Sequence, residues 1–342
     1  MEQYNILLSI AIPTYNRADY LKRCLDHIVV QFGGEQVRNS VEVVISDNAS
    51  PDNTQEVAKE YQARFPNIKY FRNEKNVGFD LNVINAVEKS TGKYCWHIGD
   101  DDFIQNGALK FVLDFLAKRE PALLTFIFHP FFDDTKSLTM VSDISEKNIK
   151  YGTSAEDFWR KEYCQGTLAL FAFRRDLWLK AKTAVAEYEL FWAYYEIILK
   201  MMLGPNLTLA YLDYPVIYMG QDFRWNSGPN THAPKIQRGV ALFTLIRWRK
   251  VLQRLKQYGY SEEFINYKIR TTVRDGLINN LLSAKTFGLD VSLENLRILL
   301  QEFYMHPFHL AIALPLFFIP NSWLRLAKNL KNLRRIKKGS GA

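Results

Sequence analysis

The sequence YCWHIGDDD, from Tyr94 to Asp102, joins an apolar run to three consecutive aspartates. The run Tyr94–Ile98 has the length and apolar character of a buried strand in a parallel sheet. Three adjacent carboxylates repel one another unless a cation reaches them. Mg²⁺ and Mn²⁺ prefer oxygen ligands, and one or two carboxylates with substrate phosphates usually complete the shell. The stretch therefore predicts a strand end that holds a metal and a nucleotide diphosphate. A solvated loop with helix-capping aspartates is the plain alternative.

Short apolar runs and amphipathic stretches alternate on both sides of this segment. Further strands are predicted at residues 7–12, 41–46, 68–73 and 123–129. Strands that alternate with helices indicate a parallel sheet built from βαβ units. In such sheets ligands bind beyond the carboxyl ends of the strands. The segments PTYN (13–16), SDNAS (46–50) and GDDD (99–102) each follow a strand directly, so we expect them to face one crevice.

The rest of the chain divides by its pattern into a mixed part and a helical part. We expect one domain over residues 1–235, a helical extension over 236–302, and amphipathic basic helices over 303–338. From residue 303 onward there is no acidic residue, while seven lysines and arginines follow. The remaining chain is then near neutral, which argues against a nucleic-acid-binding surface on the domain.

The apolar run from Phe308 to Ile319 has 12 residues and contains Pro315. It is too short to span a bilayer. With Trp323 at its edge and a basic stretch behind it, it matches an interfacial membrane anchor. A helix docked on the core, with its charges in solvent, is the alternative.

Composition sets the broad class of the protein. With 342 residues, 48% of them hydrophobic, the chain is long and apolar enough to fold. Its three cysteines, Cys24, Cys95 and Cys164, are too widely spaced for a disulfide framework or a zinc site, and they fit a reducing compartment. The N-terminal apolar run lacks a basic segment before it and soon reaches Pro13, so it reads as a strand rather than a signal peptide.

Two common nucleotide-binding patterns are missing. No G-x-G-x-x-G follows the first strand, and the sequence contains no G-x-x-x-x-G-K-[ST], which disfavours a dinucleotide-binding dehydrogenase and a P-loop enzyme. Asp47, at a strand end, could accept hydrogen bonds from a ribose or a base, whereas turn and capping chemistry is the better interpretation of Asp52 and Asn53. Taken singly, Tyr15 and the segment around Gly78 are weak signals.

Together, however, four segments in order resemble the family 2 glycosyltransferases of GT-A fold. They are SIAIPTYNR, VEVVISDNASPDNT, NEKNVGFDLNVINAV and KYCWHIGDDDFIQNGAL, within about the first 115 residues. The GDDD form is similar to abequosyltransferase-like enzymes of bacterial O-antigen synthesis. The resemblance implies an α/β fold of GT-A type, a Rossmann-like, mostly parallel sheet flanked by helices, here with a helical C-terminal extension.

The resemblance also implies site residues. The residues expected to bind the nucleotide-sugar are Pro13, Thr14, Tyr15, Asn16, Arg17, Asp47, Asn76, Gly78, Asn82 and Asp100. Arg224, in the later loop GQDFRWNSG, is added from its own chemistry, because a planar guanidinium can clamp a diphosphate; an ordinary exposed loop arginine is the alternative. The residues expected to hold Mg²⁺ or Mn²⁺ are Asp101, Asp102 and Asp100. The family's D-x-D-D aligns with residues 99–102, so Gly99 stands where its first aspartate would be. Asp101 then takes the metal-ligand position, with Asp100 as the candidate substitute for the missing carboxylate.

Inverting members of the family carry a catalytic E-D pair at the start of a later helix. This chain has no such pair in the corresponding region, AEYELFWAYYEIILKMMLG. The candidates for the catalytic base are Glu187, Glu189 and Glu196, of which Glu189 lies nearest the expected helix start. A surface carboxylate on an amphipathic helix is an equally good interpretation of each.

The implied function is sugar transfer from a nucleotide-sugar donor to a saccharide or lipid-linked oligosaccharide in bacterial surface polysaccharide synthesis. The expected location is cytoplasmic, peripherally attached to the inner face of the cell membrane. A sugar-phosphate nucleotidyltransferase is one alternative, although PTYNR is not its Gly-rich, lysine-containing loop. A catalytically silent membrane-associated binding protein is the other, supported by the missing aspartate and the missing E-D pair.

Overall fold

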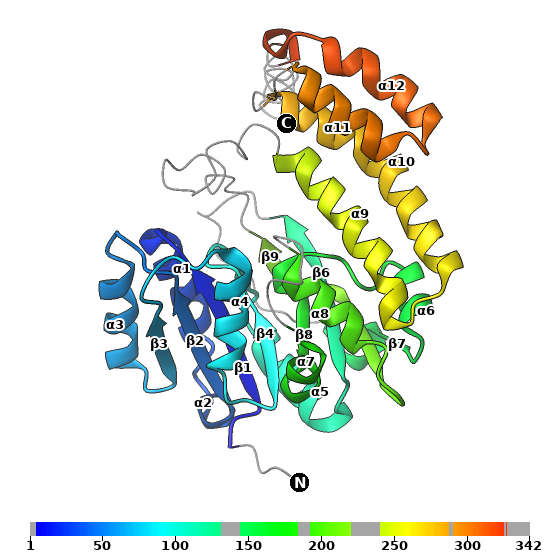
Figure 1. The fold of residues 1–342 in the computed structure, drawn as a ribbon. Coiled ribbons are helices and arrows are strands. Elements are labelled where there is room, and N and C mark those ends of the chain that lie inside the picture. Colours follow the sequence, from blue (N-terminus) through cyan, green and yellow to red (C-terminus); the bar gives the residue numbers. More distant parts are fainter. Residues whose placement is uncertain are drawn as a thin grey trace, which may run out of the picture. The chain divides into compact units, whose positions relative to one another are not determined.

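The computed structural model describes residues 5–130, 144–183, 192–219, 240–286, 289, 291–324 and 326. The chain forms two compact units, Met1–Asp222 and Phe223–Ala342 (Figure 1). The division falls within residues 220–239, outside the described ranges. The boundaries expected at residues 235 and 302 stay predictions.

The first half of unit 1 is a parallel sheet. Its strands are β1 (Leu8–Thr14), β2 (Val41–Asp47), β3 (Ile68–Arg72) and β4 (Tyr94–His97), in the order β3-β2-β1-β4. Between them run α1 (Ala18–Val29), α2 (Glu35–Ser40), α3 (Thr54–Arg64) and α4 (Phe79–Glu88). Every residue of β1 and β2 is buried, because helices cover both faces, and this explains why apolar residues predominate in both strands.

The second half of the sheet is mixed rather than mostly parallel. It contains β5 (Phe103–Ile104), β6 (Leu123–Pro130), β7 (Ile149–Gly152), β8 (Phe171–Arg174) and β9 (Leu209–Met219). The order continues β4-β8-β6-β9-β5, with β7 also paired to β9. β8 runs antiparallel to both of its neighbours, β4 and β6. The expected parallel sheet flanked by helices is therefore present, and the second half adds antiparallel pairs to it.

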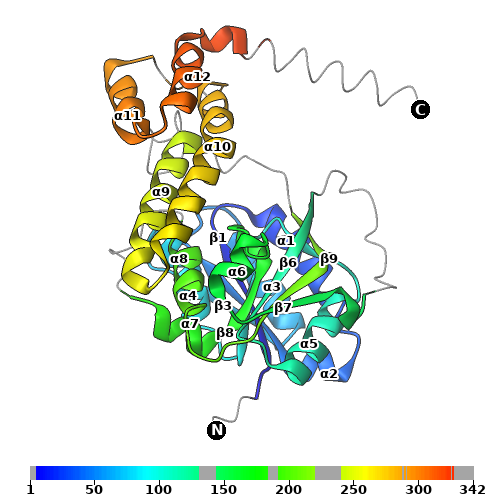
Figure 2. The same ribbon diagram turned by 90° about the vertical axis from the view of Figure 1, so that its right-hand side faces the viewer.

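Helices flank this mixed half as well. They are α5 (Ala108–Arg119), α6 (Ala155–Arg160), α7 (Arg175–Ala181) and α8 (Ala193–Met201), with 3-10 turns at Glu146–Asn148 and Leu168–Leu170. In unit 1, α4, α7 and α8 cover one face of the sheet, and α1, α2, α3 and α5 the other (Figure 2). Trp96 stacks on Phe126 with ring centroids 4.6 Å apart, and its indole N–H donates to the Ala169 carbonyl at 2.9 Å. Trp96 thus ties β4 to the second half.

Unit 2 is helical, as predicted. It contains α9 (Val240–Tyr258), α10 (Glu262–Thr286), α11 (Leu293–Phe303) and α12 (Pro307–Phe318). Its core includes Val273, Leu277 and Leu281 of α10 together with Phe303 and Phe317. Among the helices that the structure describes, none has the length and apolar content needed to cross a membrane.

Candidate functional site

Three loops meet at the carboxyl ends of β1, β2 and β4. The register of β1 and β2 sets Thr14 beside Asp47. The Thr14 hydroxyl donates to Asp100 Oδ2 at 2.7 Å, which joins the end of β1 to the loop after β4. The structure therefore brings PTYN, SDNAS and GDDD together at one edge of the sheet.

The three aspartates have different surroundings. Asp100 and Asp102 are buried, whereas the Asp101 side chain is 21% exposed. Asp102 Oδ2 accepts a hydrogen bond from the Gly99 N–H at 2.9 Å, which closes a tight turn. A Cβ atom at Gly99 would lie 2.6 Å from that same oxygen. A side chain at position 99, where the family pattern has an aspartate, would therefore force the Asp102 carboxylate to move.

Asp100 and Asp101 share one cationic side chain, Arg17. Arg17 Nε lies 2.8 Å from Asp100 Oδ1, and Arg17 Nη2 lies 2.7 Å from Asp101 Oδ2. Burial raises the pKa of the Asp100 carboxyl; the Arg17 charge opposes this rise and the Asp101 charge adds to it. The two carboxylates are therefore placed to bind one cation between them.

This pair fits a hard divalent cation. Mg²⁺ and Mn²⁺ accept one or two carboxylates and leave room for phosphate oxygens. Among the described residues, no group of three or more His, Cys, Asp or Glu side chains is arranged as a complete metal cage. The donor set therefore fits a metal whose shell is finished by a substrate diphosphate. Asp102 stays a predicted ligand, with one of its oxygens already bonded to Gly99.

Asp47 lies at the end of β2 and is fully buried. Its Oδ1 accepts from the Ser50 N–H at 2.9 Å, and its Oδ2 accepts from the Tyr70 hydroxyl at 2.7 Å. Arg72 Nε lies 3.4 Å from the same Oδ2. Tyr70 and Arg72 were not among the predicted site residues. Their two-residue spacing puts them on one side of β3, and this is the sequence signal that could have indicated them.

Asparagines hold the loop after β3 against the strand ends. Asn48 Nδ2 donates to Asn76 Oδ1 at 3.0 Å and to the Gly78 carbonyl at 3.1 Å. Asn82 Nδ2 donates to the Ser46 carbonyl at 2.9 Å. Gly78 has φ of 88°, a left-handed conformation that favours glycine. Asn76, Gly78 and Asn82 thus form a scaffold for the crevice, and direct donor contact by them stays a prediction.

The β1–α1 turn carries the remaining predicted residues. Pro13 is buried, Tyr15 is half-buried and Asn16 is exposed. Asn16 has φ of 56°, and its N–H donates to Ser50 Oγ at 2.9 Å. Asp52, a capping residue by its sequence context, accepts from the Ala18 N–H at 3.0 Å at the start of α1.

Of the three candidates for the catalytic base, the structure describes one. Glu196 is fully buried in the first turn of α8. The α8 start is held by Asp80 of α4, whose Oδ1 accepts from the Ala193 N–H at 3.2 Å. The structure thus connects the helix of Glu196 to the loop that contains Gly78. Glu187, Glu189 and Arg224 lie outside the described residues.

His97, the last residue of β4, was not predicted to matter. It is fully buried and packs against Phe173, Trp178 and Tyr194, with ring centroids 4.9, 6.3 and 6.2 Å away. Neither ring nitrogen has a hydrogen-bond partner among the described residues. Burial lowers the pKa of His97 to about 3, so the ring is neutral.

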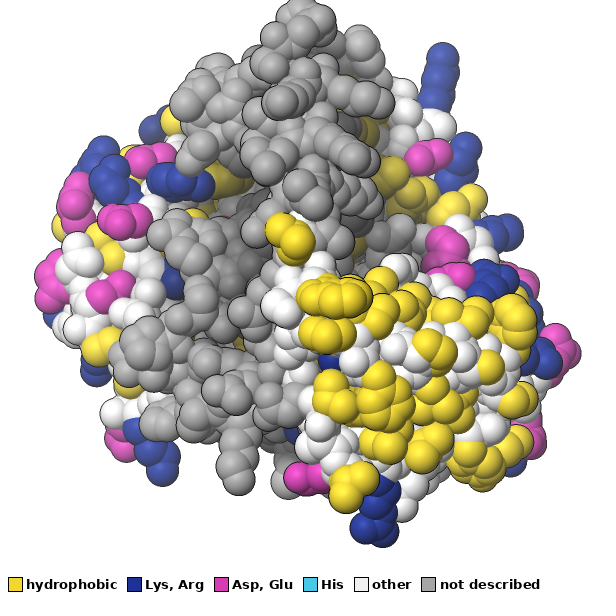
Figure 3. All heavy atoms as spheres, turned by 90° about the horizontal axis from the view of Figure 1, so that it is seen from above, with side chains coloured by type: hydrophobic (Ala, Val, Ile, Leu, Met, Phe, Trp, Pro, Cys, Tyr) yellow, Lys and Arg dark blue, Asp and Glu magenta, His cyan; other side chains and the backbone are white. Residues whose placement is uncertain are grey.

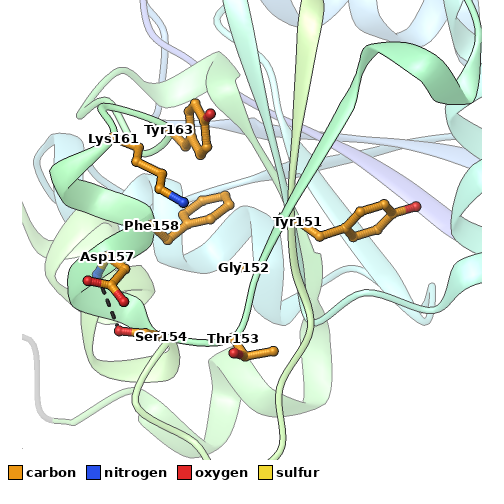
Figure 4. A pocket seen from close by; sticks show the side chains of 8 residues that line it. All are labelled: Tyr151, Gly152, Thr153, Ser154, Asp157, Phe158, Lys161 and Tyr163. Atoms are coloured by element: carbon orange, nitrogen blue, oxygen red, sulfur yellow. Dashed lines mark hydrogen bonds between the residues drawn. The ribbon is translucent and has the colours of Figure 1, made fainter.

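A pocket separate from these residues lies between β7 and α6 (Figure 4). Lys161 and Phe158 lie on its α6 side, whereas the Tyr151 side chain points away from it (Figure 4). Gly152 pairs with Leu209, at the amino end of β9. β9 runs parallel to β6, and β8 runs antiparallel to both β6 and β4, so β9 points in the same direction as β4. The pocket therefore lies at the amino ends of these strands, opposite Asp100, and we do not include it in the candidate site.

Comparison with known proteins agrees with this geometry. The model of the family described as glycosyl transferase family 2 matches residues 9–178. Abequosyltransferase RfbV of Salmonella typhimurium is 39% identical over 113 residues, which cover 32% of this chain and 33% of that protein. The GalNAc(5)-diNAcBac-PP-undecaprenol beta-1,3-glucosyltransferase of Campylobacter jejuni is 31% identical over 103 residues, covering 30% of this chain and 32% of that protein. The match thus spans about a third of the length of these relatives.

Solved structures extend the likeness of fold along the chain. S. aureus TarS 1–349 in complex with UDP-GlcNAc has a TM-score of 0.59 at 14% identity, covering 95% of this chain and 92% of that one. Mannosyltransferase PcManGT from Pyrobaculum calidifontis, in complex with GDP-Man and Mn²⁺, has a TM-score of 0.52 at 14% identity, covering 95% and 90%. At such identities the likeness shows the fold alone. Residues 9–178, which supply β1–β4 and the Asp100–Asp101 pair, are a glycosyl transferase family 2 domain of GT-A type.

Proposed function

We propose that this protein is a glycosyltransferase that moves a sugar from a nucleotide-sugar donor to a saccharide acceptor with the help of a divalent metal. The observation that carries the proposal is the pair Asp100 and Asp101, which converge on a single cation where β1, β2 and β4 end. That the pair belongs to a family 2 domain favours this reading over a nucleotidyltransferase or a silent binding protein.

Different residues of the crevice are proposed to hold the metal and the nucleoside. Asp101 and Asp100 would hold Mg²⁺ or Mn²⁺, and Thr14 orients Asp100 through its hydroxyl. The bound metal would offset the negative charge that develops on the departing diphosphate. Asp47, with Tyr15 and the loop around Gly78, would hold the nucleoside part. The complexes of TarS with UDP-GlcNAc and of PcManGT with GDP-Man and Mn²⁺ support this assignment by analogy of fold.

Transfer also needs a group that accepts the proton of the acceptor hydroxyl as that oxygen attacks the sugar carbon. Glu196 is the candidate that the structure describes, with Glu187 and Glu189 as the others. Glu196→Gln is expected to keep donor binding and to lower transfer about 10²–10⁴-fold, because the amide cannot take the proton. Unchanged transfer in this variant would move the role to Glu187 or Glu189.

The experiment that tests the proposed reaction is a donor panel. UDP-, GDP-, CDP- and dTDP-sugars are incubated with the protein and a bacterial membrane extract as the source of acceptor, and release of nucleoside diphosphate is measured. We expect release from one donor, loss of release with EDTA, and recovery with added Mn²⁺. No release from any donor in the presence of membranes would contradict the proposal.

The acceptor is proposed to be a lipid-linked saccharide of bacterial surface polysaccharide synthesis, reached from the inner face of the cell membrane. The printed name of the Campylobacter jejuni relative describes an undecaprenol-linked acceptor, and that of the Salmonella typhimurium relative an abequosyltransferase. A protein that works on such an acceptor needs a surface that binds lipid.

Unit 2 carries a candidate for that surface. We call it the apolar platform, and define it by Tyr304, Met305, Phe308, Ile312, Phe318 and Trp323, which are all exposed. Phe308 is 72% exposed and Trp323 69%. Hydrophobic side chains gather densely on one face of the helical unit (Figure 3). Soluble proteins rarely expose large contiguous apolar patches unless these bind something.

The helix behind the platform is fixed in its orientation. The buried Lys285 of α10 donates from Nζ to the Phe317 carbonyl at 2.6 Å, while Ala313 and Phe317 pack into the core of the unit. The other side of α12 must therefore face outward. The seven basic residues after residue 303 are the charge complement of an anionic leaflet, to which each contributes about 1 kcal/mol near the surface.

Vesicle flotation tests the platform. The double variant Phe308→Ser with Ile312→Ser is expected to lower partition onto anionic vesicles at least about 10-fold, because burying one large apolar side chain is worth about 1.5–3 kcal/mol. Val30→Ser, at an exposed valine of unit 1, is the matched control and should partition like wild type. Equal flotation of the double variant and the control would contradict the assignment of the platform.

A further inference from the structure

We infer that Arg17 is a built-in counter-cation of the metal site: it holds Asp100 and Asp101 until a metal–diphosphate complex replaces it. The metal then binds well only together with a nucleoside diphosphate, which gives the displaced guanidinium a new partner. This inference rests on the proposed function and adds to it an order of binding.

The contacts of Arg17 show that it spans the pair. Two different nitrogens reach two different carboxylates, Nε to Asp100 Oδ1 at 2.8 Å and Nη2 to Asp101 Oδ2 at 2.7 Å. A dication that used both carboxylates would lie next to this guanidinium. Like charges so close repel strongly in a partly buried site. Arg17 and a metal are therefore alternatives for the same pair of carboxylates.

The same contacts show that Arg17 can be displaced. Nε and Nη2 each make one close ion pair, and these go to two different carboxylates rather than to the two oxygens of one. The guanidinium also lies over the Tyr20 ring, 4.3 Å from its centroid. Charge and this ring contact hold it in place rather than a directed bidentate bond, which would be the stronger arrangement.

The position of Arg17 in the chain offers it a second partner. It is the residue before α1, and two residues separate it from the end of β1, so its side chain starts at the edge of the sheet where the diphosphate would bind. A guanidinium matches phosphate oxygens in shape and charge. Once a metal–diphosphate complex occupies the aspartates, Arg17 exchanges two carboxylates for phosphate. Metal alone offers no such exchange.

Binding of Mn²⁺, followed by electron paramagnetic resonance of the free ion, tests this directly. For wild type we expect weak binding of Mn²⁺ alone and much tighter binding with a nucleoside diphosphate. In Arg17→Gln the affinity for Mn²⁺ alone should rise at least tenfold, and the gain from the nucleotide should shrink. Arg17→Lys keeps the charge but not the planar guanidinium, so its affinity for Mn²⁺ alone should lie between those of wild type and Arg17→Gln.

The control is Arg23→Gln, which removes the same charge from a guanidinium that lies over the Tyr20 and Phe103 rings. It should bind Mn²⁺ like wild type, and thermal melts check that all variants are folded. If Arg17→Gln and Arg23→Gln bind Mn²⁺ alone equally, the role of Arg17 is overturned. In that event, Mn²⁺-dependent nucleotide binding by wild type would leave the proposed function standing, and its absence would remove both.

Discussion

Asp101→Ala is expected to lower sugar transfer on the order of 10³-fold, the size of effect seen when one preorganised charge-stabilising group is removed from an active site. Asp101 is the more exposed of the two carboxylates that converge on Arg17, so it is the one that a metal–diphosphate complex meets first. Its loss would leave Asp100 as the only carboxylate of the pair, beside Asp102, one of whose oxygens is bonded to the Gly99 N–H. The measurement is the rate of nucleoside diphosphate release from the preferred donor at saturating Mn²⁺.

Asp114→Ala is the matched control for this change. Asp114 lies on α5 and pairs with Lys110 one turn away, at an exposed site. The control should transfer sugar at the wild-type rate. If Asp101→Ala also transferred sugar at the wild-type rate, the assignment of Asp101 as a metal ligand that the reaction needs would be overturned.

The second large effect is on stability in acid. The His97 pKa is about 3 in the folded chain, against an ordinary value of 6.5. Below pH 6.5 the His97 ring is protonated in the unfolded chain, whereas in the folded chain it stays neutral down to about pH 3. The free energy of unfolding should therefore fall by about 1.4 kcal/mol for each pH unit from 6.5 down to 3. Above pH 6.5 the ring is neutral in both states, and the stabilisation is fully present.

His97→Phe isolates this contribution. Phenylalanine fits a site already lined by Phe173, Trp178 and Tyr194, and it does not titrate. Urea unfolding of wild type and variant at pH 7, 6, 5 and 4 gives the free energy of unfolding of each as a function of pH. We expect this free energy to fall less steeply with falling pH in the variant. Parallel profiles would mean that the His97 ring takes up its proton without unfolding.

Much of the parallel half could be predicted from the sequence, because β1, β2 and β4 are buried on both faces and are therefore mostly apolar, apart from a few buried polar residues such as Ser9 and Glu42. The meeting of three loops followed from parallel strands, whose carboxyl ends share one edge. The direction of β8 could not be predicted. Side chains alternate in the same way in parallel and antiparallel strands, so the pattern carries no direction.

The site was predictable in its residue types but not in its contacts. The aspartate run stands out in the sequence, whereas the assignment of Asp102 to a turn depends on a 2.9 Å bond to Gly99. The ion pairs of Arg17 depend on where α1 starts after the bend at Asn16, which has positive φ. Such contacts between residues far apart in the chain arise from the fold, and no local pattern encodes them.

The measurement that tests the central claim most directly is calorimetric titration of the wild-type protein with UDP, GDP, CDP and dTDP, with and without Mn²⁺. The account predicts that one of these nucleotides binds, and that its binding requires the metal. Equal binding with and without Mn²⁺, or binding of none of them, would contradict a metal–diphosphate site at Asp100 and Asp101.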